Sequence, residues 1–129
     1  MSLTFYYGSG SPFAWRVWLS LEHKALPYQF KLLSFDAKDT KKPEFLALNP
    51  RGQVPVIQDG DFALYESAVI PEYLEDRYPS ADAAHALLPK DVEQRALARR
   101  LAKEVDTYLW PQSHKLAVQY FFTPEAERN

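Results

Sequence analysis

The feature that most constrains the fold is a helix set closely between two strand-like segments at the start of the chain. Residues 3–7 form a short apolar run followed by the turn residues 8–10, which predicts a buried strand. Ser11-Pro12 predicts a helix start, because serine caps free amides and proline is tolerated at the first helical position. We expect this helix to continue through Leu26, and residues 28–35 to form a second strand. A crossover of this length makes the two strands parallel.

The next segments predict the rest of one α/β domain. In order they are a short helix at 43–48, a third strand at 54–58, a hairpin turn at Asp59-Gly60, a fourth strand at 62–65 and a helix at 66–78. The predicted order is βαβ, then a linking helix, then ββα. It forms a mixed four-stranded sheet with helices on both faces.

The character of the sequence changes after residue 80. Residues 81–90 are expected to be a linker after a domain at 1–80, and residues 91–129 the beginning of an all-helical domain. Within it, 91–109 predicts a helix with one apolar stripe, after which Pro111 bends or breaks the helix and 113–122 adds a helical turn or two. The stripe consists of Leu97, Leu101, Val105 and Tyr108.

Composition excludes several kinds of function. The 129 residues include no cysteine, so disulfides and thiolate chemistry by the protein's own side chains are excluded. His23, His85 and His114 show no metal-site spacing. With a net charge of −2 there is no electrostatic case for nucleic acid, and no apolar run approaches the roughly 20 residues that span a bilayer. We expect a cytoplasmic protein without a metal and without nucleic-acid or membrane partners.

Three places in the predicted domain have the chemistry of a peptide site. Ser11 lies at a helix N-terminus, which favours an anion such as a thiolate; alternatively, it only caps its helix. A cis bond between Val54 and Pro55 would leave the backbone of Val54 free to pair with an extended peptide; the alternative is an ordinary trans proline. Glu66 and Ser67 begin another helix, where a carboxylate and an ammonium of one ligand could be held; the alternative is capping alone.

Two further groups are weaker candidates. The lysine cluster Lys38, Lys41 and Lys42 could meet a carboxylate or form a solvated loop. The aromatic residues from Tyr108 onward could wall an apolar pocket or pack in a core.

Taken together, these motifs resemble the glutathione transferase family. Residues 6–17 resemble its first strand, active loop and first helix. Residues 49–55 resemble its cis-proline loop, and residues 66–74 its γ-glutamyl site and third helix. The match runs from residue 3 to 79 in order and spacing. It implies a thioredoxin-like glutathione-binding domain of a serine-using class similar to tau, zeta or theta, followed by a truncated helical domain.

The resemblance also implies roles for individual residues. Ser11, or Ser9 as a second candidate, would donate a hydrogen bond to the sulfur of glutathione. Phe13 and Tyr108 would lie near the electrophile. The remaining glutathione contacts would come from Gln53, Val54, the cis-proline Pro55, Glu66, Ser67, and Lys41 or Lys42.

The implied function is conjugation of the glutathione thiolate to a hydrophobic electrophile by a homodimeric detoxification enzyme. A glutathione-dependent isomerase of the same family and a non-catalytic truncated glutathione-binding or interaction module are the alternatives. Pro71 departs from the family pattern, and must fall in the first turn of its helix or bend it.

Overall fold

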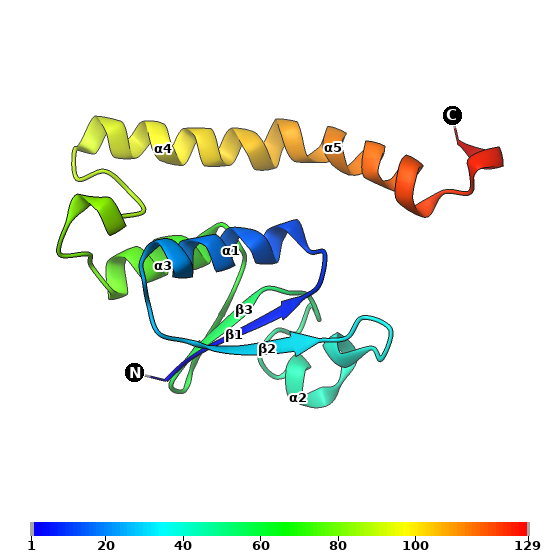
Figure 1. The fold of residues 1–129 in the computed structure, drawn as a ribbon, viewed down its shortest axis with the longest axis horizontal. Helices are drawn as coiled ribbons and strands as arrows, with labels where there is room; N and C mark the ends of the chain where they lie inside the picture. The colour runs from blue at the N-terminus through cyan, green and yellow to red at the C-terminus, as the bar shows by residue number, and fades with distance from the viewer. Residues whose placement is uncertain (1, 129) are drawn as a thin grey trace. The chain divides into compact units, whose positions relative to one another are not determined.

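The computed structural model of the chain describes residues 2–128 and divides into two compact units after Leu87. In the first unit the elements follow one another in the predicted order (Figure 1). They are β1 (Leu3–Gly8), α1 (Pro12–His23), β2 (Gln29–Leu33), a 3₁₀ turn (Asp39–Lys41), α2 (Pro43–Leu46), β3 (Val56–Asp59), β4 (Phe62–Tyr65), α3 (Val69–Arg77) and a second 3₁₀ turn (Ala83–His85).

The four strands form one mixed sheet in the order β2-β1-β3-β4. β1 and β2 are parallel, with Phe5 opposite Phe30, as the helical crossover requires. β3 is antiparallel to both β1 and β4. The predicted fold class is therefore confirmed: a mixed four-stranded sheet in a thioredoxin-like arrangement of helices.

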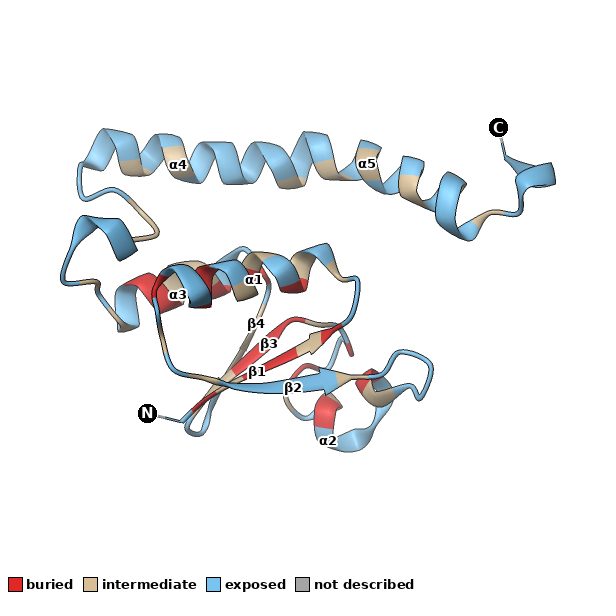
Figure 2. Ribbon diagram, in the orientation of Figure 1, coloured by how far each residue is buried: buried red, intermediate tan, exposed pale blue. Residues whose placement is uncertain are grey.

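Successive side chains of β1 point to opposite faces of the sheet, and each face carries its own buried cluster. Leu3 and Phe5 face α1 and α3, and pack in a core with Val17 and Leu74. Tyr6, the residue after Phe5 in β1, points to the opposite face of the sheet and packs against Phe45 of α2. In Figure 2 the buried positions follow β1, β3 and the inner sides of α1 and α3, while β2 is mostly exposed.

Helix α1 ends at His23, three residues earlier than the sequence predicts. Ala25 adopts a left-handed conformation, with φ of 51°. Its amide donates to Glu22 O, and the amide of Leu26 donates to Leu21 O. This pair of bonds is the Schellman ending of a helix, usually built on glycine, so the missing glycine signal explains the wrong boundary.

Two predicted details around α3 are wrong and one open alternative is decided. The hairpin loop is Gly60-Asp61, because Asp59 is still paired with Phe62 in the strands. Ser67 makes no capping bond to α3, whose first residues are preceded by Ala68. Pro71 lies in the first turn of the helix, where its missing N–H costs nothing.

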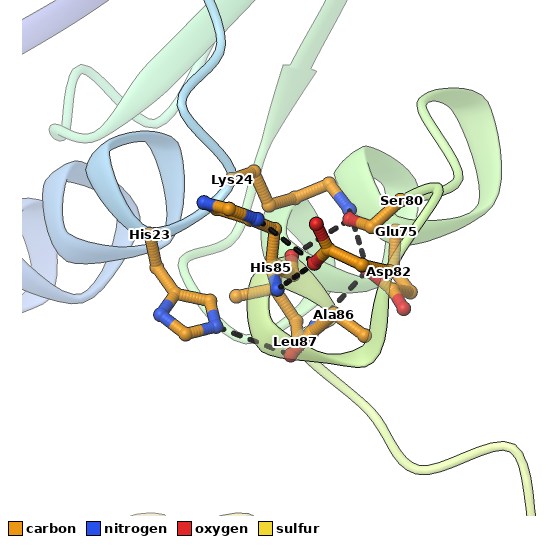
Figure 3. Close-up of polar contacts among 8 residues, drawn as sticks. All are labelled: His23, Lys24, Glu75, Ser80, Asp82, His85, Ala86 and Leu87. Carbon is orange, nitrogen blue, oxygen red and sulfur yellow. Dashed lines mark hydrogen bonds and ion pairs between the residues drawn. The ribbon is translucent and has the colours of Figure 1, made fainter.

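A buried ion pair joins the end of α1 to α3. Lys24 Nζ lies 2.6 Å from Glu75 Oε2, with only 1% of the lysine side chain exposed. Lys24 also donates to Ser80 Oγ at 2.9 Å, and Glu75 Oε2 accepts from the Leu87 amide at 3.1 Å. Figure 3 shows these bonds drawing the segment after α3 back against α1 and α3. His23 Nε2 adds a contact to Ala86 O at 3.2 Å.

The second unit is helical without interruption from Val92 to Phe122, and a separate 3₁₀ turn follows an extended Thr123. It comprises α4 (Val92–Glu104), a π-helical turn (Val105–Leu109), α5 (Trp110–Ala117), a second π-helical turn (Val118–Phe122) and a 3₁₀ turn (Glu125–Glu127). Asp91 caps α4, accepting from the Gln94 amide at 2.9 Å. The helix does not break at Pro111, because the wider π-helical turn before it relieves the clash of the proline ring with a preceding carbonyl. Among the described residues, no helix is long and apolar enough to cross a membrane.

Candidate functional site

The strand registers bring the candidate residues to one edge of the sheet. Tyr6 of β1 lies opposite Val56 of β3, and Val56 lies opposite Tyr65 of β4. Because β3 runs antiparallel to both neighbours, its first residue lies at the same edge as the last residues of β1 and β4. Ser11 follows β1 by three residues, and Ser67 follows β4 by two. Val54 and Pro55 immediately precede β3 at this edge.

Ser11 begins α1. Its Oγ accepts from the Ala14 amide at 3.2 Å, so the predicted capping role is confirmed. A hydroxyl has one hydrogen and two lone pairs, and the cap uses a lone pair only. The hydrogen of Ser11 therefore stays compatible with donation to a ligand atom at the helix N-terminus, where the helix dipole also favours negative charge.

The bond between Val54 and Pro55 is cis, as the resemblance implied and against the trans alternative. The loop before it is built around Asn49, whose side chain is almost fully buried. Asn49 Nδ2 donates to Gln53 O at 2.8 Å, and Asn49 Oδ1 accepts from the Arg51 amide at 3.0 Å. Asn49 was not among the residues that the sequence singled out, although an Asn-Pro pair commonly marks such a turn.

Gly52 allows this loop to pack against residues 39–41. Its φ is 60°, and a Cβ at this position would lie 2.7 Å from Thr40 O. Lys41 Nζ donates to Gly52 O at 3.1 Å, so the predicted ligand lysine is bound to the loop backbone and keeps two further hydrogens. Lys42 instead pairs with Asp39 at 2.6 Å, and this carboxylate raises the pKa of Lys42.

The turn before α3 carries the third part of the site. Glu66 has a left-handed backbone with φ of 81°, and its carbonyl accepts from the amides of Val69 and Ile70. The Glu66 side chain is exposed, whereas Ser67 is buried. Arg16 Nη1, from the second turn of α1, donates to Ser67 Oγ at 3.3 Å. No local sequence pattern indicates this contact, because the two residues are 51 positions apart.

The remaining predicted residues lie in different surroundings. Ser9 is exposed and lines a hollow together with Phe35 and Asp36, on the side of β2. Phe35 covers the turn after β1 so closely that a Cβ at Gly8 would lie 2.2 Å from its ring. Phe13 lies in the first turn of α1. Tyr108 belongs to the second unit, where its side chain is 69% exposed.

Among the residues that the structure describes, no three histidine or acidic side chains gather in a way that could hold a metal ion. The arrangement offers two helix beginnings, one peptide backbone before a cis-proline and charged side chains of both signs. That combination suits a small zwitterionic peptide.

The fold and this edge define a thioredoxin-like domain, and comparison with known proteins identifies its family. A family model described as "Glutathione S-transferase, N-terminal domain" matches residues 10–77. "Glutathione S-transferase 1" of Dianthus caryophyllus is 36% identical over 115 residues, which are 89% of this chain and 50% of that protein. "Glutathione S-transferase A" of Pleuronectes platessa is 36% identical over 132 residues, covering 98% of this chain and 56% of that protein.

A solved structure agrees with these relatives. The theta class glutathione S-transferase of Xanthomonas axonopodis pv. citri, crystallised with glutathione bound, superposes with a TM-score of 0.85 at 29% identity. The superposition covers 99% of this chain and 59% of that one. The chain therefore belongs to the glutathione S-transferase family. It spans about half the length of the curated relatives that it matches.

Proposed function

We propose that the chain binds glutathione at the edge formed by Ser11, Val54 and Ser67, and conjugates its thiolate to an electrophilic small molecule. The observation that carries the proposal is the shared edge, which follows from the pairing of Val56 with both Tyr6 and Tyr65. The family membership and the relative crystallised with glutathione support the same ligand.

Each part of the peptide has a counterpart at this edge. The cysteinyl backbone would pair with Val54 beside the cis-proline. The γ-glutamyl end would lie between Glu66 and Ser67, and the glycyl carboxylate would meet Lys41, with Lys42 and Gln53 nearby. The sulfur would then lie at the start of α1, where the Ser11 hydroxyl donates to it and lowers the pKa of the ligand's thiol.

Catalysis needs no protein base in this proposal. A thiol at a helix N-terminus loses its proton to water more readily, and the enzyme then holds the thiolate near an electrophile. The hydrophobic electrophile would be bound near Phe13, with Tyr108 of the second unit as a further candidate. A homodimer in the cytoplasm remains part of the proposal, supported by the family alone.

The test is a calorimetric titration with glutathione combined with consumption of a model aryl halide, on the unmodified chain and two Ser11 variants. Ser11→Ala removes both the cap and the hydroxyl. Ser11→Asp keeps an oxygen for the Ala14 amide but cannot donate to a thiolate. A hydrogen bond to a charged group contributes about 1.5–3 kcal/mol, so both variants should react roughly 10- to 100-fold more slowly.

The two variants separate chemistry from folding. If Ser11→Asp keeps the melting temperature and loses the rate, the hydroxyl acts on the ligand. Unchanged rates in both variants would remove Ser11 from the mechanism and leave Ser9 to be tested. Glutathione binding without any consumption would indicate a non-catalytic binding module, and absence of binding would overturn the proposed function.

A further inference from the structure

We propose that Arg16 is a positioning residue for the glutathione site: its guanidinium holds Ser67 Oγ as an acceptor, so that the single hydrogen of Ser67 is available to the α-carboxylate of the γ-glutamyl group. This inference rests on the proposed function and adds a residue from α1 to it. It makes the Arg16–Ser67 pair a selector for that carboxylate.

The chemistry of the two groups determines the direction of the hydrogen bond between them. A guanidinium carries only donors, so in the contact between Arg16 Nη1 and Ser67 Oγ the serine must accept. A hydroxyl that accepts one bond still has its own hydrogen to give. In the part of the chain that the structure describes, Ser67 Oγ donates to no other group. The bond from Arg16 thus fixes the serine as a donor toward an incoming acceptor.

The burial and position of Ser67 also suit its hydroxyl to a bound carboxylate. Only 8% of the residue is exposed, and a buried hydroxyl without an acceptor costs free energy that a bound carboxylate would recover. Ser67 lies two residues beyond β4, at the shared edge, and the contact to Arg16 bridges 51 positions of sequence. The hydroxyl is therefore fixed from the α1 side and does not depend on the α3 backbone, to which it makes no cap.

The positive charge of Arg16 adds a preference for ligands that carry the carboxylate. A carboxylate oxygen accepting from Ser67 Oγ would lie within about 6 Å of the guanidinium nitrogen, given the 3.3 Å contact and an ordinary hydroxyl bond. At this separation a positive charge attracts a carboxylate but has little effect on an uncharged group in the same place. Arg16 should consequently favour ligands that carry the carboxylate over those that lack it.

A purely structural role predicts a different result. Arg16 also ties α1 to the turn before α3, and loss of such a tie would loosen the site for every ligand alike. The discriminating quantity is therefore the ratio of two dissociation constants on the same protein sample, which does not depend on the fraction of folded chains. The two ligands are glutathione and its analogue with hydrogen in place of the γ-glutamyl α-carboxylate, γ-aminobutyryl-cysteinyl-glycine.

The experiment measures both ligands by calorimetry on the unmodified chain, Arg16→Gln, Arg16→Lys and Ser67→Ala. We expect the unmodified chain to prefer glutathione by tenfold or more, and Arg16→Gln to reduce this preference to within about twofold by weakening glutathione binding alone. Arg16→Lys, which keeps a charge and a donor, should recover part of the preference. Ser67→Ala should resemble Arg16→Gln, and the double variant should lose no more than either single one.

The outcomes separate the two proposals. If Arg16→Gln weakens both ligands by the same factor, or neither, the positioning role is overturned while glutathione binding stands. If the unmodified chain binds both ligands equally, the selector is absent and this inference also fails alone. If the unmodified chain binds neither ligand, the proposed function fails first and takes this inference with it.

Discussion

At the scale of single residues, the site includes a backbone conformation that residues other than glycine rarely adopt. Glu66 is left-handed, with φ of 81°, directly before the buried Ser67. An L-residue in this region costs about 1–2 kcal/mol, and such strain persists where the surrounding structure imposes it. A glycine here would fit the turn better but would supply no carboxylate, which gives Glu66 a reason to be retained for binding.

Replacement of Glu66 tests that reasoning. We expect Glu66→Gly to raise the free energy of unfolding by about 0.5–1 kcal/mol, since relief of the strain exceeds the added flexibility of the unfolded chain. The same variant should bind glutathione at least several-fold more weakly. Glu66→Gln, which keeps the strain and loses the charge, is the matched control: it should lose affinity without gaining stability. A destabilised Glu66→Gly would show that the turn is not strained. Urea unfolding and calorimetry provide the two measurements.

At the scale of elements, the buried Lys24–Glu75 pair holds α1, α3 and the segment after α3 together. Removing one member of a buried ion pair takes the compensating charge away from the other, which costs about 3–5 kcal/mol. We therefore expect Lys24→Met to lower the free energy of unfolding by that amount, measured by urea denaturation. The double variant Lys24→Met with Glu75→Leu should recover part of the loss, because it removes both charges from the interior.

An exposed pair in the same unit provides the control. Lys42 and Asp39 lie 2.6 Å apart, but half of the lysine side chain is in solvent. Lys42→Met should therefore leave the free energy of unfolding almost unchanged, because solvent screens an exposed ion pair. Equal losses for Lys24→Met and Lys42→Met would contradict the assignment of the buried pair as the stronger tie.

Element order was predictable from the sequence because strong local signals mark it, whereas contacts between distant elements were not. Ser11-Pro12 and the strands at 3–7 and 62–65 were expected within a residue of where they lie. The bond from Arg16 to Ser67 and the ion pair of Lys24 join residues 51 positions apart, and no local pattern encodes them. At Ala25 and Glu66 the chain adopts left-handed conformations without glycine, so the usual signal was missing.

In the candidate site, too, local features were predictable from the sequence and contacts between distant elements were not. The sequence named Ser11, Val54 and Ser67, and the strand registers bring all three to one edge. It could not decide whether Ser67 caps α3, because the Ser67 hydroxyl instead accepts from Arg16 of the distant helix α1. It also gave no sign that Phe35 would cover Gly8 or that Lys42 would be paired with Asp39. The position of Phe35 follows from the return of β2 beside β1, whereas Lys42 and Asp39 are three residues apart and their pairing depends on the 3₁₀ turn at Asp39–Lys41.

At the scale of the whole molecule, the first unit contains aspartates whose interactions depend on being ionised. The hydroxyl of Tyr78 donates to Asp59 and lowers the pKa of this carboxyl below its ordinary value. The hydroxyl of Tyr73 and the positive charge of Arg77 act in the same direction. Burial, together with the Asp59 carboxylate, raises the pKa of Tyr78 to about 12. Asp59 ends β3 and the tyrosines belong to α3 and its end, so this cluster fastens the hairpin to the helix.

The direction of these shifts fixes how global stability depends on pH. A carboxyl whose folded pKa is depressed binds fewer protons in the folded than in the unfolded chain, so its contribution is fully present above the unfolded pKa of about 3.9. The contribution is lost as pH falls through the lower folded pKa. Asp39, held by Lys42, and Asp82, held by His85, have pKa values lowered in the same direction. The unit should therefore weaken in acid.

Comparison of the unmodified chain with Asp59→Asn isolates the largest of these clusters. Urea unfolding followed by tyrosine and tryptophan fluorescence at pH 6 and pH 3 gives the free energy of unfolding for both proteins. We expect Asp59→Asn to be the less stable at pH 6 and the difference to shrink at pH 3, because protonation removes from the unmodified chain the charge that the variant already lacks. A difference that stays constant would mean that Asp59 acts through shape and neutral hydrogen bonds. A difference that grows in acid would require a folded pKa above the ordinary value, contrary to the donors that surround this carboxylate.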